Sequence, residues 1–154
     1  MDFSDTPEKS EYRASVWALL TENAEPKEPG KTFKVKYGAD DLVPLAKEWQ
    51  AKKHAAGYAG ITMPQEYGGQ GGSQLQQIIY SQEESNFITP RGVYEIGLGM
   101  CIPTMLTYAT EEQKERYATP ALEGKEIWCQ LFSEPSAGSD LAGLRTRCVR
   151  DGDD

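Results

Sequence analysis

The spacing of apolar residues predicts two helices in the first third of the chain. The first begins at Thr6-Pro7, where a hydroxyl can cap free amide groups and the proline φ already suits a first helical turn. Its apolar face carries Tyr12, Val16, Leu19 and Leu20. A second helix runs from about Asp40 toward Gly57, where the glycine is expected to stop it. Its apolar stripe consists of Leu42, Leu45, Ala46 and Trp49. The turn and breaker residues of segment 25–30 predict a loop between the two helices.

The glycine-rich segment 57–72 predicts a shaped loop, because a continuous helix would not tolerate so many glycines. After it, Ser73 and Gln76 have the spacing of a capping box, which opens a third helix. The residues that we expect this helix to direct inward are Leu75, Ile78, Ile79 and Phe87. Its neighbouring acids Glu83 and Glu84 point in different directions on a helix, so they are expected on a solvated face rather than as a catalytic pair.

Segment 93–108 is nearly all apolar, which predicts a buried central helix that Pro103 bends or breaks. Its apolar members include Ile96, Met100, Cys101, Met105 and Leu106. Thr110 and Gln113 then repeat the capping-box spacing and open a further helix, which Pro120 and Gly124 are expected to close. After residue 126 the character changes, because the run 127–132 is rich in residues that favour strands. The helical part is therefore predicted to end there.

Composition excludes several kinds of function. Asp and Glu number 24 against 16 Lys and Arg, so neither nucleic acid nor an anionic membrane is an expected partner. No run of about 18 apolar residues occurs and no signal peptide is visible, which predicts no membrane span and an intracellular location. Cys101, Cys129 and Cys148 lack the spacing of a zinc site or a disulfide framework, and the one histidine, His54, is expected on a solvated helix face. No metal site is predicted.

The segment 130–140, Gln-Leu-Phe-Ser-Glu-Pro-Ser-Ala-Gly-Ser-Asp, resembles the signature of the acyl-CoA dehydrogenase family. Three further pieces match that family in the same order, at residues 60–69, 110–114 and 122–126. Taken alone, segment 133–140 is a polar turn, but the register of the four matches outweighs that interpretation. Two departures are visible, because Gln130 stands where many members carry an aromatic residue and Ser136 replaces a common glycine.

The resemblance implies a mainly α fold. Residues 1–125 would form the helical, bundle-like N-terminal domain of acyl-CoA dehydrogenases, and residues 126–154 the first strand of an incomplete β-barrel domain. It also implies FAD as the cofactor, bound by a strand end and the loop that follows it. The expected flavin-contacting residues are Gln130, Leu131, Phe132, Ser133, Gly138 and Ser139. Ser139 would also lie near the acyl-CoA thioester, and Glu134 is expected to organise the loop rather than act as a base.

The implied reaction is oxidation of an acyl-CoA across its Cα–Cβ bond, with a glutamate as base and flavin as hydride acceptor. The parent enzyme would be a homo-oligomer that passes electrons to an electron-transfer flavoprotein, in the cytoplasm or, after loss of a presequence, the mitochondrial matrix. No catalytic base is assigned in this chain, so the isolated chain is expected to be inactive. The helix end near Phe87 and segment 93–106 are the expected lining of an acyl-CoA pocket. A non-catalytic binding or scaffold module with the same fold stays open as an alternative.

Overall fold

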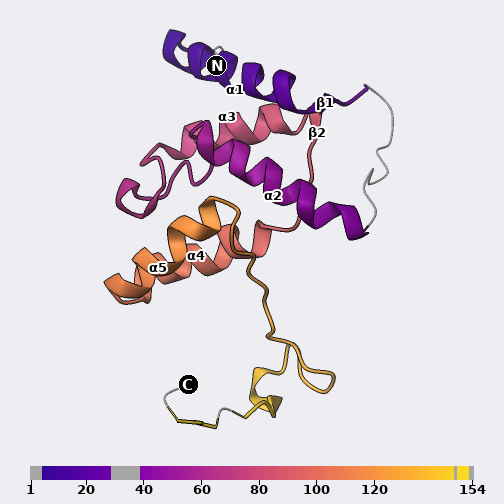
Figure 1. Ribbon diagram of the computed structural model, residues 1–154, viewed down its shortest axis with the longest axis vertical. Coiled ribbons are helices and arrows are strands. Elements are labelled where there is room, and N and C mark those ends of the chain that lie inside the picture. The colour runs from indigo at the N-terminus through magenta and orange to yellow at the C-terminus, as the bar shows by residue number, and fades with distance from the viewer. Residues whose placement is uncertain (1–4, 29–38, 148, 153–154) are drawn as a thin grey trace.

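The computed structural model of the chain describes residues 5–28, 39–147 and 149–152. Its elements stand in the order α1 (Pro7–Asn23), β1 (Glu25–Pro26), α2 (Ala39–Ala55), η1 (Gln65–Tyr67), α3 (Gln74–Glu84), β2 (Phe87–Ile88), the π-helix η2 (Gly97–Cys101), α4 (Ile102–Tyr108), α5 (Glu111–Leu122) and η3 (Leu141–Gly143). Helices dominate, as predicted. Figure 1 shows α1 above α3, α2 crossing beside α3, and α4 with α5 beneath them.

The helix starts follow the sequence with one exception. Both capping boxes form. The side chain of Ser73 accepts a hydrogen bond from the backbone N–H of Gln76, and that of Thr110 accepts one from the backbone N–H of Gln113. Each glutamine side chain in turn accepts from the backbone N–H of the capping residue. At the start of α1 the proline lies in the first turn as expected. The hydroxyl of Thr6, however, makes no capping hydrogen bond within the described residues, so the expected cap is wrong.

The upper core joins α1, α2 and α3. Buried apolar side chains from all three helices, the glycine-rich loop and β2 contact one another there: Val16, Leu20, Trp49, Ile61, Tyr80 and Phe87. Full burial of such a side chain contributes roughly 1.5–3 kcal/mol, so this cluster is the main reason that α1 stays on the domain. The short antiparallel pair β1 and β2 ties the end of α1 to the end of α3, with Pro26 opposite Phe87.

The lower core lies between the glycine-rich loop, α4 and α5, where the cluster Tyr67, Ile102, Ala118 and Ala121 is buried. Gly69 shows why the loop needs glycine, because a Cβ at that position would collide with the backbone carbonyl of Met63. The predicted shaped loop is therefore confirmed. Its turns are closed by backbone hydrogen bonds, including those from Gly68 to Gln65 of η1 and from Gly69 to Pro64. Its role in the described residues is to join the upper and lower cores.

Two expectations about burial are wrong. Leu75 and Ile78 lie on the outer face of α3, with Ile78 52% exposed, and the inward face carries Ile79, Tyr80 and Glu83 instead. The acids Glu83 and Glu84 are not solvated, because Arg13 of α1 and the indole of Trp49 face them and supply hydrogen bonds. Phe87 is buried as expected, although it lies in β2 rather than in the helix.

The apolar segment 93–108 is helical with a defect. Its middle is the π-helix η2, in which the amide of Ile102 donates to the carbonyl of Gly97, directly before Pro103. A proline lacks an amide proton and displaces the preceding turn, so the predicted distortion is confirmed. Complete burial is wrong, because only Gly97 and Ile102 are buried on η2 and α4, whereas Met100 is 46% exposed.

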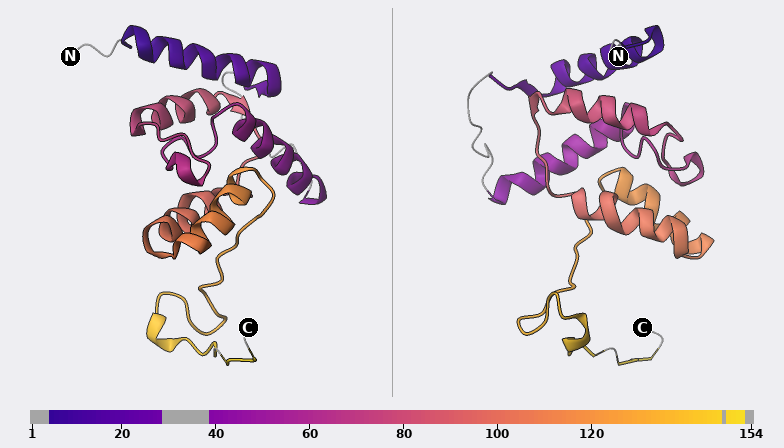
Figure 2. Two further views of the ribbon diagram at one scale, coloured as in Figure 1. Left: turned by 60° about the vertical axis from the view of Figure 1, so that its left-hand side comes forward. Right: turned by 180° about the vertical axis from the view of Figure 1, so that it is seen from behind.

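The chain leaves the helices after α5. That helix continues past Pro120 to Leu122 and stops before Gly124, whose φ of 80° suits a helix end, so Pro120 does not close it. Residues 127–132 form no strand, because no other described segment lies alongside to complete a ladder. Figure 2 shows this part of the chain as an arm that extends away from the helices and ends in a folded loop. No helix in the described ranges is long and apolar enough to span a membrane.

Candidate functional site

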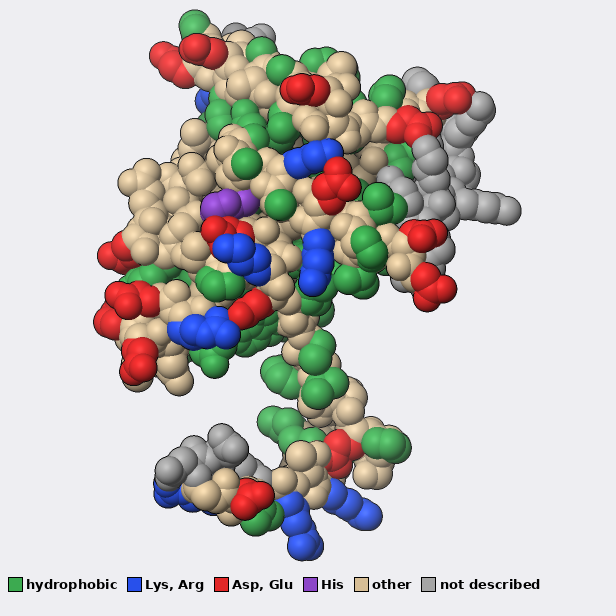
Figure 3. Space-filling model, in the orientation of Figure 1, with side chains coloured by type: hydrophobic (Ala, Val, Ile, Leu, Met, Phe, Trp, Pro, Cys, Tyr) green, Lys and Arg blue, Asp and Glu red, His purple; other side chains and the backbone are tan. Residues whose placement is uncertain are grey.

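The arm is anchored to the helices at Trp128. The indole meets Tyr117 of α5 edge-on at 5.4 Å between ring centroids, and the Trp128 side chain covers the backbone of Gly97. Beyond this anchor the apolar side chains lie open, with Leu131 87% exposed and Phe132 largely exposed. Figure 3 shows hydrophobic side chains along the arm and also at several places on the helical body. The predicted flavin-contacting residues Gln130, Leu131 and Phe132 are exposed, and no backbone-to-backbone hydrogen bond among the described residues involves them.

Glu134 organises the loop that follows. Its backbone exchanges hydrogen bonds with Ala137, at 2.7 Å and 3.2 Å between nitrogen and oxygen, which closes a tight turn. Its carboxylate accepts the amides of Arg145, at 2.9 Å, and Thr146, at 2.6 Å, together with the Thr146 hydroxyl. The hydrogen bond from the Thr146 side chain, followed by those from the two amides, lowers the pKa of this carboxyl. The predicted loop-organising role of Glu134 is confirmed.

The turn brings the two ends of the predicted flavin loop together. The Ser133 hydroxyl oxygen lies 3.8 Å from where a Cβ on Gly138 would stand, so the serine lies over the glycine backbone. Ser139 follows directly, and Ser133, Gly138 and Ser139 are all exposed. The loop thus offers two hydroxyls without a hydrogen-bond partner among the described residues, together with a glycine that lets a ligand approach the backbone. These groups fit the edge of a flat, hydrogen-bonding ring system.

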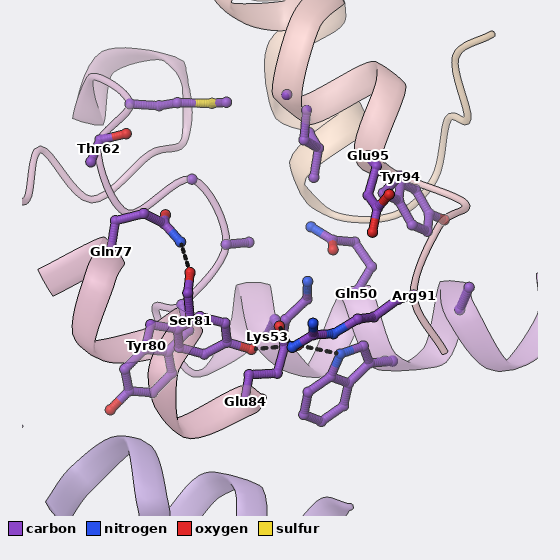
Figure 4. A pocket seen from close by; sticks show the side chains of 18 of the residues that line it. Gln50, Lys53, Thr62, Gln77, Tyr80, Ser81, Glu84, Arg91, Tyr94 and Glu95 are labelled. Carbon is purple, nitrogen blue, oxygen red and sulfur yellow. Dashed lines mark hydrogen bonds and ion pairs between the residues drawn. The ribbon is translucent and has the colours of Figure 1, made fainter. Parts of the chain in front are cut away.

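A cavity of about 630 Å³ opens in the helical domain, between α2, the start of the glycine-rich loop, α3 and the segment 90–106. Figure 4 shows the side chains that converge there. The end of α3 contributes Tyr80, Ser81 and Glu84, and the later segment contributes Arg91, Glu95 and Leu106 among others. The two segments that the sequence predicted as pocket lining therefore do line one cavity. Its volume is within the range of about 300–1,000 Å³ that small-molecule sites occupy.

Glu84 is the centre of a hydrogen-bond network at the lower edge of Figure 4. It accepts from the Trp49 indole at 3.2 Å, from the Tyr80 hydroxyl at 3.1 Å and from the Arg91 guanidinium at 3.1 Å. Burial, reinforced by the charge of Glu84, raises the pKa of Tyr80, so the phenol stays protonated and donates. This network fixes one wall of the cavity.

The polar side chains on the α2 wall of the cavity are less completely hydrogen-bonded. Gln50 is 1% exposed, and its amide nitrogen donates to the carbonyl of Leu122 at 2.8 Å, yet no donor in the described part of the chain reaches its Oε1. Lys53 stands one turn further along, and burial lowers the pKa of its ammonium. The cavity-facing residues Gln50, Lys53, Glu84 and Arg91 were not predicted. Continuing the apolar stripe from Ala46 and Trp49 by helical spacing would have reached Gln50 and Lys53.

Comparison with known proteins gives the family. Residues 6–125 match the family model described as acyl-CoA dehydrogenase, N-terminal domain. Acyl-CoA dehydrogenase FadE26 of Mycobacterium tuberculosis is 35% identical over 100% of this chain and 38% of its own length. The chain thus spans well under half of the relatives that it matches.

Solved structures agree with the sequence relatives. The ChsE4-ChsE5 complex from Mycobacterium tuberculosis superposes with a TM-score of 0.74 at 31% identity, covering 99% of this chain and 37% of the other. A structure named Tcur3481-Tcur3483 steroid ACAD gives a TM-score of 0.69 at 29% identity, over 99% of this chain and 38% of that one. The chain belongs to the acyl-CoA dehydrogenase family, and residues 6–125 form its N-terminal domain.

Proposed function

We propose that this chain supplies the flavin-facing loop and one wall of the acyl pocket of an FAD-dependent dehydrogenase, which oxidises acyl-CoA thioesters across the Cα–Cβ bond. One observation carries the proposal above all. The loop 133–140, which resembles the family signature, lies in a chain that matches an acyl-CoA dehydrogenase over its whole length, and hydrogen bonds to Glu134 hold the loop in shape.

The loop's chemistry fits a flavin. Backbone groups of Gln130, Leu131 and Phe132 are open to hydrogen-bond the ring edge, and the hydroxyls of Ser133 and Ser139 flank the approach at Gly138. Flavin supplies the hydride acceptor that amino-acid side chains lack. We place the acyl-CoA thioester next to Ser139, so that the flavin ring and the thioester would both lie close to this residue.

The cavity fits the acyl group. Apolar and aromatic side chains cover much of its surface, including Trp49, Tyr58, Met63, Leu98 and Leu106. We propose an electron-transfer flavoprotein as the electron acceptor and association with further dehydrogenase chains. The related ChsE4-ChsE5 structure is itself a complex, which supports such association. No residue of this chain is assigned as the base, so we expect no turnover from the chain alone.

Titration of the purified chain with FAD tests the proposal, with binding followed by flavin fluorescence. Saturable binding is expected, and Ser133→Ala and Ser139→Ala should each weaken it about fivefold to tenfold, the equivalent of one hydrogen bond. Ser136→Ala is the matched control, since it removes a hydroxyl from the same exposed loop at a position without an assigned contact. No saturable binding, or an equal loss in all three variants, would contradict the flavin assignment.

A further inference from the structure

We propose that the Lys53 ammonium holds an acceptor oxygen of the acyl group, so that the cavity favours acyl chains with a carbonyl or a carboxylate beyond the thioester over plain alkyl chains. The inference deepens the proposed function, on which it rests for identifying the ligand as an acyl group. The cavity residues themselves argue for the kind of atom that is bound, a hydrogen-bond acceptor.

Lys53 lies on the cavity side of α2. It lines the cavity directly, and Figure 4 shows its side chain on the same side of that helix as the side chain of Gln50. The residue is half-buried, and burial lowers the pKa of its ammonium, although the charge of Glu84 acts in the opposite direction. The ammonium has thus lost part of its hydration, which a ligand oxygen would replace.

The Lys53 ammonium has no ion-pair or hydrogen-bond partner among the described residues. The ion pairs of that part of the chain do not include it, and the groups that affect its pKa do so through burial and through charge, not through a hydrogen bond. An ammonium carries three donors and no acceptor, and a partly desolvated charge is normally paired. The ligand group that fits is therefore an acceptor oxygen, whereas a second cation would be repelled.

The other charged groups that line the cavity are paired or lie in water. Arg91 and Glu84 bind each other at 3.1 Å, so each has an opposite charge beside it. Glu95 is exposed, and water and salt screen its charge. Lys53 is thus the charged residue of this lining that lacks a partner in the described ranges. A neutral carbonyl and a carboxylate can both supply the missing acceptor, and the probes chosen here distinguish the two.

Three small probes with the same pentyl tail test the cavity without any need for flavin or coenzyme A. 2-Heptanone carries a methyl ketone, hexanoate carries a carboxylate, and 2-methyl-1-heptene has a CH₂ group in place of the ketone oxygen. The readout is the indole N–H signal of Trp49, which lines the cavity, in a nitrogen-15 correlation spectrum assigned with Trp49→Phe. The alkene measures the apolar contribution alone, so the oxygen probes report what Lys53 adds.

Lys53→Met is the decisive variant, because methionine is similar in length and has no donor. We expect it to weaken binding of the oxygen probes about fivefold to tenfold, the equivalent of one hydrogen bond, and to leave binding of the alkene unchanged. A loss confined to the ketone or to the carboxylate supports the proposal and identifies the oxygen group. Lys53→Arg keeps a cationic donor and should keep the affinity for the oxygen probes.

Lys52→Met is the matched control. It makes the same change at the neighbouring position of α2, where the lysine pairs with Glu48 and does not line this cavity. All three affinities should stay as they are in the wild-type chain.

Unchanged binding of all three probes to Lys53→Met would overturn the proposal, since it would leave Lys53 as a solvated ammonium only. No binding of either oxygen probe to the wild-type chain would overturn it as well. If Lys53→Met does not fold, the carbon-13 signal of Lys53 Cε in the wild-type chain decides: the oxygen probes should shift it more than the alkene does, and equal shifts count against the proposal. The FAD titration is a separate experiment, so failure of the flavin assignment and failure of this cavity assignment are distinguishable.

Discussion

Arg13 connects α1 to α3 through a carboxylate that lies almost out of solvent. Its guanidinium is 2.5 Å from Glu83, which is 8% exposed, and 2.7 Å from Asp5. The hydrogen bonds that Arg13 donates to Asp5 and then to Glu83 raise the pKa of its guanidinium. A charge held this far from water depends on its partner, so the pair should matter more than a surface ion pair.

Replacing Glu83 by glutamine tests this. We expect Glu83→Gln to lower the free energy of unfolding by about 1–2 kcal/mol, because the buried charge-assisted hydrogen bond is weakened while Arg13 keeps Asp5. Glu48→Gln makes the same change in the exposed pair with Lys52 and should have a much smaller effect, because an exposed ion pair contributes little to stability. Urea unfolding of both variants measures the difference, and equal effects would contradict the importance assigned to Glu83.

The Glu134 carboxyl gives a pH dependence that belongs to the loop. Its pKa is lowered in the folded chain, so its contribution is present above the usual carboxyl pKa of about 4.3 and is lost as pH falls through the folded value. The backbone amide signals of Arg145 and Thr146 should therefore shift together with a midpoint below about 4.3. Glu134→Gln should remove that titration. A midpoint at or above the usual value would show that the loop contacts do not form.

At residue scale the sequence predicted what depends on local chain chemistry. The role of Glu134 followed from a turn motif, and its partners Arg145 and Thr146 lie only 11 and 12 residues away. Glu83 and Glu84 were misjudged because their partners are distant: Arg13 is 70 residues from Glu83 and Trp49 is 35 from Glu84. Gln50, whose Oε1 has no partner among the described residues, was missed for the same reason, because its amide nitrogen donates to Leu122, 72 residues away.

Among the elements, the helix caps offer a direct test. Ser73→Ala and Thr110→Ala should each destabilise the chain by about 1 kcal/mol, because each removes a capping hydrogen bond to an N3 amide. Thr6→Ala should change stability by less, since the Thr6 hydroxyl makes no such bond in the described structure. Thermal unfolding followed by circular dichroism at 222 nm compares the three variants. A large loss in Thr6→Ala, or none in the other two, would be inconsistent with these caps.

The type of an element was predictable where it depends on residues close in sequence. The face that a helix buries and the pairing of strands depend on distant residues, and these were harder to predict. Capping boxes, glycine stops and the effect of Pro103 all follow from residues within one or two turns. The face of α3 that points inward is decided by contact with α1, which leaves Leu75 and Ile78 outside. A strand at 127–132 needs a neighbouring strand, and no described segment provides one.

In the whole molecule, the two candidate sites lie on different parts of the chain. The cavity belongs to the helical domain, and the loop 133–140 lies on the arm that Trp128 anchors against η2 and α5. The family resemblance predicted both regions and their order along the chain. It did not predict the polar wall of the cavity, because Gln50, Lys53, Glu84 and Arg91 come together only through packing of α2 against α3 and the segment after β2.

The most direct measurement of the central claim is a nitrogen-15 correlation spectrum of the chain, recorded first with FAD and then with an acyl-CoA added. We expect FAD to shift the amides of residues 130–139, and the acyl-CoA then to shift the indole signal of Trp49 and amides of α3 and segment 90–106. Signals of the outer face of α1 should stay in place. Shifts from FAD confined to the helices, or an acyl-CoA that leaves Trp49 and segment 90–106 unchanged, would contradict it.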